Sequence, residues 1–426
     1  MSDNQHLKRQ IGLWQLVSYY FSTIVGVGIF IIPVTAARFA GPASIISWLV
    51  VLVMVYPFAI IFGNISQKYK VSGSIQRCIE DAFGYRFGKS MALFLIATAI
   101  FGNSMLGYYS AQYIMAFLQY HDKGLGILLS IFMMALSSLF NLLNIKTSSR
   151  VHGLALLFLI IIIELVAIIS VPSYQYDHLV PFMPYGVGSV FLAIIPCFYA
   201  VVGWENVDAM AEEVKDPVNT YKKAIRITLF LVALFYLSLV CTVIFVLTPE
   251  QIKSQNTILT ILLSNLFGHS GGKVGSIMAI VLLFLGANVW ILGTSRLIFA
   301  LARDNILPKN LCKINVKTGI PTFAVISQVM IYVIIFGAMF VVDMHEDVII
   351  EIAGLNYIIL YIVIFASTIK IFTRSTYLKS LSGFSLAASS LLLIMNLNYT
   401  LFISALIALA CLVYVYYFKR KMKFIA

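Results

Sequence analysis

The sequence predicts an all-α membrane protein in which residues 1–426 form a single domain of twelve transmembrane helices. Three observations carry this prediction. First, 61% of the residues are hydrophobic and only 11% are charged, whereas charged residues make up about 25% of an ordinary soluble domain. Second, long apolar segments follow one another along the whole chain. Third, the Lys and Arg residues gather in alternate connections between these segments, as in proteins that cross a bilayer several times.

A window of about 19 residues, the length of a helix that crosses the apolar core of a bilayer, divides the chain into twelve spans. The predicted spans cover residues 13–34, 43–65, 90–119, 126–144, 152–171, 186–211, 224–247, 274–302, 322–342, 347–372, 380–396 and 399–418. The connections between them are short, and none is long enough for a separate soluble domain. The function is therefore expected to be carried out within the bilayer.

The positions of the charged residues predict the orientation of the chain. Nearly all of its 29 Lys and Arg residues fall on the side of the bilayer that holds both termini. The exceptions are Arg38, Lys123, Lys253 and Lys273 on the opposite side and Arg296 within a span. Because basic connections stay in the cytoplasm, both termini are predicted to be cytoplasmic. The net charge of +12 is explained in this way, and no nucleic-acid partner is expected.

The sequence shows no pattern typical of a catalytic or cofactor site. The five cysteines have neither the spacing of a metal site nor that of a disulfide framework. The six histidines fall mostly at the ends of spans or in connections, and no catalytic set assembles around them. Neither an enzyme nor a cofactor is therefore expected. The first span is too long for a signal peptide and is expected to be retained.

The first span contains the stretch that weakens it most, Gly26-Val27-Gly28, with a proline a turn further on. Glycine and proline disfavour a helix interior, and irregular backbone inside a bilayer is tolerated only where it faces protein or a water-filled cavity. The stretch predicts an unwound helix. Its amides at Val27 and Gly28 would bind an anionic group, and the carbonyls of Thr23 and Ile24 would accept hydrogen bonds. Close packing of helices through small residues is the alternative interpretation.

The sixth span is the second one that is expected to break. It contains Pro196, Gly203 and Glu205, and a glutamate in an apolar span costs roughly 2.5–3.5 kcal/mol on insertion scales. Spans one and six each begin a group of five, which is typical of an inverted repeat with a site near the middle of the bilayer. The predicted repeats are residues 13–171 and 186–372, in the LeuT-like arrangement, and residues 380–418 add two further helices.

Several motifs accompany the two interrupted spans. They include Gly12-Leu-Trp-Gln before span one, Ala211-Glu-Glu-Val-Lys-Asp-Pro217 after span six and Ile352-Ala-Gly-Leu-Asn356 in span ten. Together with Gly26-Val-Gly28 and Gly203-Trp-Glu205, these motifs resemble those of the APC superfamily of amino-acid permeases. The finer pattern is similar to its methionine and branched-chain amino-acid exporter group. The resemblance covers nearly the whole chain and implies a bacterial inner-membrane protein.

The resemblance also implies how a substrate would be held. The amides of Val27 and Gly28 would bind the substrate carboxylate, and carbonyls of spans one and six would bind its ammonium. Tyr199 and Trp290 would pack on the substrate side chain. The residues expected to contact the substrate are Thr23, Ile24, Gly26, Val27, Gly28, Tyr199, Ala200, Val202, Gly203 and Trp290. Asn103 and Asn356 either line the same cavity or tie helices together.

The coupling ion is the least determined feature of this prediction. Glu205 matches a glutamate proposed to couple protonation to gating, and the alternative is a buried carboxyl bonded to neighbouring helices. Relatives often carry a lysine in span five, where this chain has Glu164 as a second candidate proton carrier. Thr294 and Ser295 either serve a sodium site or pack helices together. Relatives also have serine at the position of Val27, so the carboxylate would be held by amides alone.

The expected function is secondary active transport of small neutral, apolar amino acids of the methionine and branched-chain type by alternating access. Export by proton antiport is the direction that the subgroup resemblance implies. A proton- or sodium-coupled uptake symporter and an exchanger of the same fold are the nearest alternatives. A channel or a nutrient sensor is the alternative of a different class. The expected partners are an amino acid, a proton or sodium ion and the lipid bilayer, and the oligomeric state is left open.

Overall fold

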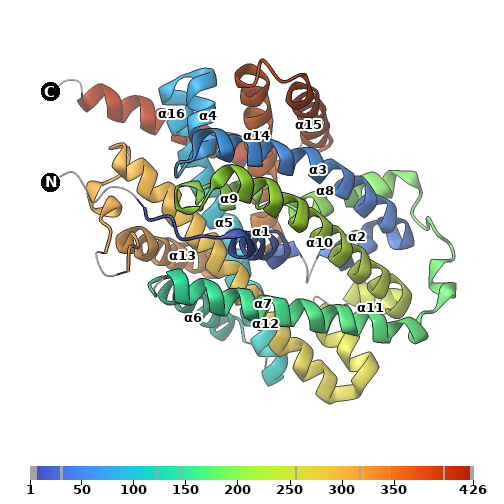
Figure 1. The fold of residues 1–426 in the computed structure, drawn as a ribbon. Helices are drawn as coiled ribbons and strands as arrows, with labels where there is room; N and C mark the ends of the chain where they lie inside the picture. Colours follow the sequence, from blue (N-terminus) through green and yellow to red (C-terminus); the bar gives the residue numbers. More distant parts are fainter. Residues whose placement is uncertain are drawn as a thin grey trace.

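The computed structural model describes residues 7–28, 32–120, 122–143, 145–254, 257–315, 318–344, 346–396 and 399–422. The side chains of Val27 and of residues 145–151, 254, 347 and 418–422 lie outside this description. The described chain is helical almost throughout (Figure 1), and its isolated β-bridge pairs Ile11 with Val214 in parallel. The predicted all-α fold is thus confirmed for the described residues.

The chain up to Ala200 supplies eight helices. They are α1 (Leu13–Gly28), α2 (Ile32–Ala40), α3 (Ser44–Tyr69), α4 (Ser74–Phe83), α5 (Tyr85–Leu118), α6 (Lys123–Asn141), α7 (Ile145–Ser170) and α8 (Val187–Ala200). The rest of the chain supplies α9 (Trp204–Asp208), α10 (Pro217–Val246), α11 (Pro249–Ser254), α12 (Ile258–Arg303), α13 (Thr322–Val342), α14 (Glu346–Ile371), α15 (Thr376–Met395) and α16 (Tyr399–Met422). Short 3₁₀ turns cover 41–43, 171–173, 176–179, 211–213 and 309–312.

Eleven segments of the described chain are long and apolar enough to cross a bilayer. They correspond to the predicted spans two to twelve. The predicted span 13–34 is divided between α1, which has only 16 residues, and α2, and residues 29–31 lie outside the description. The number of crossings and the inverted repeat therefore stay predictions.

Helix α12 is longer than the predicted span 274–302 because it contains two segments. The backbone leaves the helical region at Gly268, where φ is +66°, and the chain folds back on itself. The Thr260 and Ser276 hydroxyls meet at 2.9 Å across this hairpin. A Cβ at Gly275 would lie 2.5 Å from the Leu259 carbonyl oxygen, so the close approach requires glycine. Sequence hydropathy alone does not detect such a hairpin.

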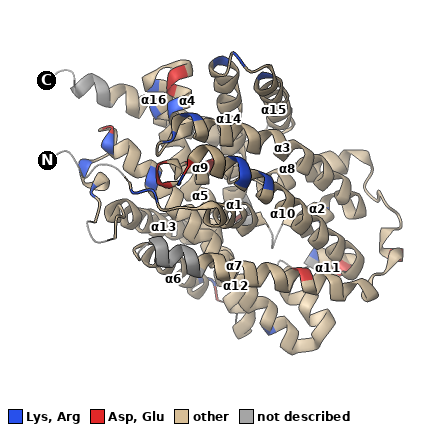
Figure 2. Ribbon diagram, in the orientation of Figure 1, with Lys and Arg blue, Asp and Glu red and all other residues tan. Residues whose placement is uncertain are grey.

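Helix α1 lies at the centre of the bundle (Figure 1), where it packs against α5, α7, α8, α9, α10 and α12. Both termini lie on the same side of the molecule, and most of the Lys and Arg segments in Figure 2 lie toward that side. The C-terminal helix joins this side through Arg86, whose guanidinium lies 5.1 Å from the Tyr416 ring centre. The weakened glycine stretch of span one is therefore placed in the protein interior, away from lipid.

Candidate functional site

The helix predicted for span six is interrupted in the structure. Helix α8 ends at Ala200 and α9 begins at Trp204. Gly203 adopts φ of +134°, which L side chains rarely adopt, and a Cβ there would lie 3.1 Å from the backbone carbon of Thr23. Glycine is needed at this position both for the backbone conformation and for the approach to α1.

The structure corrects the prediction that the helix of span one is unwound at Gly26–Gly28. Helix α1 continues through Gly28, so residues 25–28 are helical, and residues 29–31, which follow, lie outside the described residues. The two glycines allow close packing instead. A Cβ at Gly26 would lie 3.1 Å from the Gly286 Cα of α12, and one at Gly28 would lie 2.6 Å from both Ala200 and the Tyr236 hydroxyl. The packing interpretation therefore describes this conformation.

The backbone carbonyls predicted to accept hydrogen bonds do so from side chains. The Trp290 indole Nε1 donates to the Thr23 carbonyl at 3.1 Å. The Tyr236 hydroxyl lies 3.1 Å from the Ile24 carbonyl oxygen and 2.7 Å from that of Ala200, so it joins the ends of α1 and α8. Tyr236 is fully buried in α10 and was not singled out from the sequence. Its hydroxyl connects the two interrupted spans directly.

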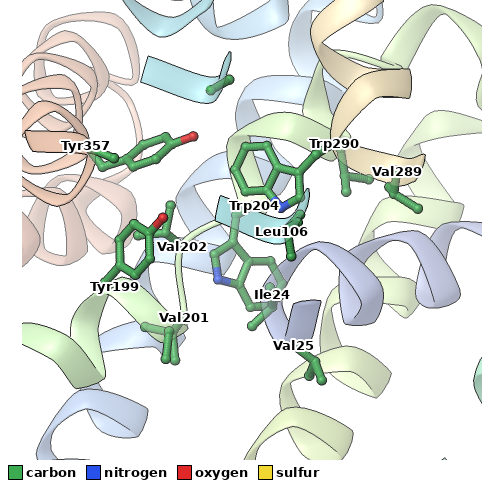
Figure 3. Close-up of a cluster of buried hydrophobic side chains, with 14 of the residues drawn as sticks. Ile24, Val25, Leu106, Tyr199, Val201, Val202, Trp204, Val289, Trp290 and Tyr357 are labelled. Atoms are coloured by element: carbon green, nitrogen blue, oxygen red, sulfur yellow. The ribbon is translucent and has the colours of Figure 1, made fainter. Parts of the chain in front are cut away.

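A small cavity lies between these helices. Its volume is about 10 Å³, which is roughly the space of one water molecule. Figure 3 shows Tyr199, Trp290 and Tyr357 facing the same space. The lining residues are Thr23, Ile24, Gly102, Tyr199, Val202, Trp290 and Tyr357. Gly102 and Tyr357 were not among the predicted site residues, and a cavity made by five helices gives no local sequence signal.

A larger cavity of about 650 Å³ lies on the other side of Tyr199. Tyr199 lines both cavities, so it forms part of the wall between them. The larger cavity is lined by residues of α2, α5, α8 and α14, among them Arg38, Phe198, Glu346 and Glu351. It lies toward the C-terminal end of α2, which is the end of the bundle away from the N-terminal segment. We call it the vestibule.

The opposite end of the bundle is closed by ion pairs and backbone bonds. Arg296 and Glu213 are both almost completely buried, and their closest N–O distance is 2.9 Å. Arg303 pairs with Glu212 at 3.3 Å. The backbone at residues 10–11 bonds to Glu213, and the amide of Leu7 donates to the Glu212 side chain. The sequence placed Arg296 within a span but did not identify its partner, which lies 83 positions away.

Glu205 lies in the first turn of α9 and is buried to 1% exposure. Its Oε2 accepts from the Tyr361 hydroxyl at 2.5 Å and from the Gly203 amide at 3.2 Å. Its Oε1 has no hydrogen-bond partner within the described residues. Glu205 therefore ties the interrupted span to α14, and one of its oxygens stays unsatisfied.

A second carboxyl follows one turn later and was missed in the sequence. Asp208 is fully buried, and its Oδ1 accepts from the Tyr20 hydroxyl of α1 at 2.6 Å. Its Oδ2 has no partner within the described chain. The signal that could have found it is the spacing of Glu205 and Asp208, which places two acids on one face of an apolar helix.

Other predicted residues lie outside the small cavity. The Asn103 amide donates to the Tyr332 hydroxyl at 2.6 Å, and both side-chain polar atoms of buried Asn356 have no described partner. Half-buried Glu164 accepts from Ser238 at 3.0 Å. The Ser295 hydroxyl is bonded within α12, whereas the buried Thr294 Oγ1 has no partner in the described part of the chain. None of these residues lines either cavity.

Comparisons with known proteins agree with this architecture. A family model described as amino acid permease matches residues 11–420. The chain is 26% identical over 344 residues to the branched-chain amino acid permease BcaP of Bacillus subtilis, covering 76% of this chain and 73% of that protein. It is 26% identical over 317 residues to the L-methionine/branched-chain amino acid exporter YjeH of Escherichia coli, covering 70% and 71%. It is 24% identical over 332 residues to the human large neutral amino acids transporter small subunit 2, covering 74% and 62%.

Proposed function

The chain belongs to the amino acid permease family, and from this we propose that it is a secondary active transporter of small neutral, apolar amino acids that works by alternating access. The family and the relatives support amino-acid transport across a membrane by a multi-pass protein, and not an enzymatic reaction. The substrate type, the direction and the coupling ion are the parts that we propose.

The observation that carries the proposal is the position of Tyr199 between two cavities. The vestibule of about 650 Å³ reaches Tyr199 from one end of the bundle, whereas Arg296 and Glu213 close the other end. The small cavity of about 10 Å³ must widen before an amino acid fits in it. A carrier needs a barrier on each side of its site. Tyr199 would form the barrier toward the vestibule, and Arg296 with Glu213 would form the barrier at the other end.

The lining of the small cavity favours an apolar side chain. Ile24, Val202, Trp290 and the rings of two tyrosines surround it, and no ionisable carboxyl or basic group is among its lining residues. A charged substrate side chain would lose its hydration there without gaining a partner. The substrate that fits this chemistry has a neutral, apolar side chain.

The substrate backbone would be held by helix ends. If the last turn of α1 opens, the amides of Val27 and Gly28 become available to the carboxylate. The carbonyls of Thr23 and Ile24 would stay paired, since Trp290 and Tyr236 already donate to them. Carbonyls at the break in span six, those of Tyr199 and Val202, would accept from the ammonium, whereas the Ala200 carbonyl stays with Tyr236. Gly28, which lies against Ala200, and Gly203, which lies against Thr23, let α1 and the interrupted span six approach closely enough for this.

We propose export by proton antiport, with both termini in the cytoplasm of a bacterial inner membrane. The exporter among the relatives and the buried Glu205 carboxyl support this direction and this ion. Uptake is the alternative, supported by the branched-chain permease relative. Sodium coupling through Thr294 and Ser295, or proton transfer at Glu164, remain the rival coupling schemes.

Counterflow in proteoliposomes tests the transport proposal. Vesicles loaded with unlabelled leucine or methionine are diluted into medium with a trace of the labelled amino acid. Transient accumulation of label, with none in vesicles loaded with lysine or glutamate, is the expected result. A channel or a sensor would show no accumulation, and this outcome would refute the proposed function.

The direction needs a separate measurement in cells. Cells that overproduce an exporter should tolerate toxic analogues of methionine or leucine, because the analogue is removed. Greater sensitivity than in cells without the protein would instead establish uptake. Repeating the counterflow with and without sodium separates the two coupling ions.

A further inference from the structure

We propose that Asp208 is a second proton-binding carboxyl of the coupling site and that it passes the proton between Glu205 and the closed end of the bundle. This inference rests on the proposed proton-coupled transport. The transfer breaks an O–H bond on one carboxyl and forms one on the other, and no electrons are gained or lost. A single proton thus moves along helix α9.

The two carboxyls have matching surroundings. They are three residues apart on α9, a spacing that places side chains next to each other with Cβ atoms about 5–6 Å apart. Each is buried to 1% exposure or less, and each accepts from one tyrosine hydroxyl, Tyr361 for Glu205 and Tyr20 for Asp208. Each also keeps one oxygen without a partner in the described chain. That oxygen is where a proton can be bound.

Two nearby acids on the same segment provide the contrast. Glu212 pairs with Arg303 and Glu213 with Arg296, whereas no Lys or Arg of the described chain pairs with Glu205 or Asp208. A buried carboxylate without a cation is costly, and uptake of a proton removes that cost. Acids that serve only to hold the fold together are expected to be paired, as Glu213 is. The unpaired acids are therefore the ones suited to gain and lose protons.

The groups around Asp208 lead toward the closed end. Tyr20 of α1 and Tyr221 of α10 face its carboxyl, together with Ser66 of α3. From α4, the Ser74 hydroxyl lies 3.3 Å from that of Ser66 and also donates to the backbone oxygen of Asp208.

Beyond this group, the amide of Ser72 donates to Glu212, which also binds the N-terminal segment. Helix α12 packs against α9, and its buried Arg296 is already held by Glu213. Polar groups thus extend from Asp208 to the face that opens in the next step of transport. Glu205, by contrast, bonds to Gly203 at the break of span six.

The test compares proton movement with substrate exchange in proteoliposomes. Asp208→Asn keeps the size and the Tyr20 contact but cannot carry a proton. We expect counterflow of leucine at equal pH to stay near the wild-type rate. Accumulation driven by a pH gradient, and the leucine-evoked pH change read by an internal dye, should fall by about tenfold or more. The pH profile of net transport should flatten, and Asp208→Glu should restore it.

Two further variants complete the design. Asp216→Asn makes the same chemical change on the exposed loop after α9 and should leave the pH profile unchanged. Tyr20→Phe removes the hydrogen bond to Asp208 and should shift the midpoint of the pH profile, which keeps the proposal testable if Asp208→Asn fails to fold.

The outcomes separate the two claims. A wild-type pH profile and proton flux in Asp208→Asn would overturn the role of Asp208 alone. Loss of counterflow at equal pH in a variant that is thermally stable would overturn it as well, because the residue would then serve binding. Absence of counterflow in the wild-type protein would instead refute the proposed function.

Discussion

Replacing Gly28 with alanine tests how closely α1 and α8 must approach. The new Cβ would lie 2.6 Å from the Ala200 Cα, the Ala200 Cβ and the Tyr236 hydroxyl. Carbon atoms in contact prefer about 3.5–4.0 Å, so the helices would have to separate by about 1 Å. Two of these three atoms belong to a residue without a flexible side chain, so they cannot move aside.

The size of the effect follows from these contacts. Overpacking of this kind costs about 1–3 kcal/mol. Displacing Tyr236 leaves the buried carbonyls of Ile24 and Ala200 without their donor, at a further cost of about 1–3 kcal/mol. Alanine regains about 1 kcal/mol of helix propensity over glycine. We therefore expect Gly28→Ala to lower the free energy of unfolding by roughly 1–5 kcal/mol and to abolish counterflow.

The matched control is Gly337→Ala in α13, where nothing lies within 4 Å of the added Cβ. Thermal unfolding in detergent and leucine counterflow are measured for both variants. Gly337→Ala should unfold at or slightly above the wild-type temperature and transport normally. If Gly28→Ala matches the wild type in both measurements, the close approach of α1 and α8 does not have the importance that we assign to it.

Three further predictions concern other parts of the molecule. Glu213→Ala leaves Arg296 buried without a partner and should lower the free energy of unfolding by about 3–5 kcal/mol. Adding Arg296→Met to the same chain should restore most of this stability. If the double variant recovers no stability, the unpaired charge is not the cause of the loss. Gly102→Ala places a Cβ 3.3 Å from the Tyr199 hydroxyl. Counterflow of leucine should therefore fall about tenfold, while counterflow of the smaller alanine persists. An equal loss for both amino acids would exclude a role of Gly102 in the choice of substrate side chain. Burial raises the pKa of the Cys78 thiol to about 12, so maleimide should label the partly exposed Cys312 but not Cys78 at pH 8 until the protein is unfolded. Because this folded-state pKa lies above the ordinary thiol value of about 9.0, the Cys78 contribution to stability is complete below about pH 9 and disappears as the pH rises toward 12.

Several parts of the fold followed from composition alone. The predicted span 322–342 coincides with α13, and the predicted helix break before Trp204 is present between α8 and α9. These features depend on residues that are close in sequence, namely apolar runs of bilayer length and a glycine after a proline-containing helix. Hydropathy and helix propensity are local properties, and a single sequence contains them completely.

Other features depended on contacts between distant residues. Gly26 and Gly28 read locally as an unwound stretch, yet their missing side chains allow Gly286 and Ala200 to pack against a helical α1. The donor for the Ile24 carbonyl, Tyr236, lies 212 positions away. No periodicity in the sequence indicates such a partner.

The sequence by itself determined the class of the protein, the positions of most spans and the break of span six before Trp204. Only the tertiary structure decided to which backbone carbonyls Trp290 and Tyr236 donate hydrogen bonds, which acids are paired with arginine, and which residues enclose the small cavity. The physical reason is that burial of apolar surface sets where helices lie in a bilayer, whereas the pairing of buried polar groups depends on how separate helices are placed against one another. Asp208 and Glu213 illustrate this, since both are acids near the end of span six and only their neighbours distinguish them.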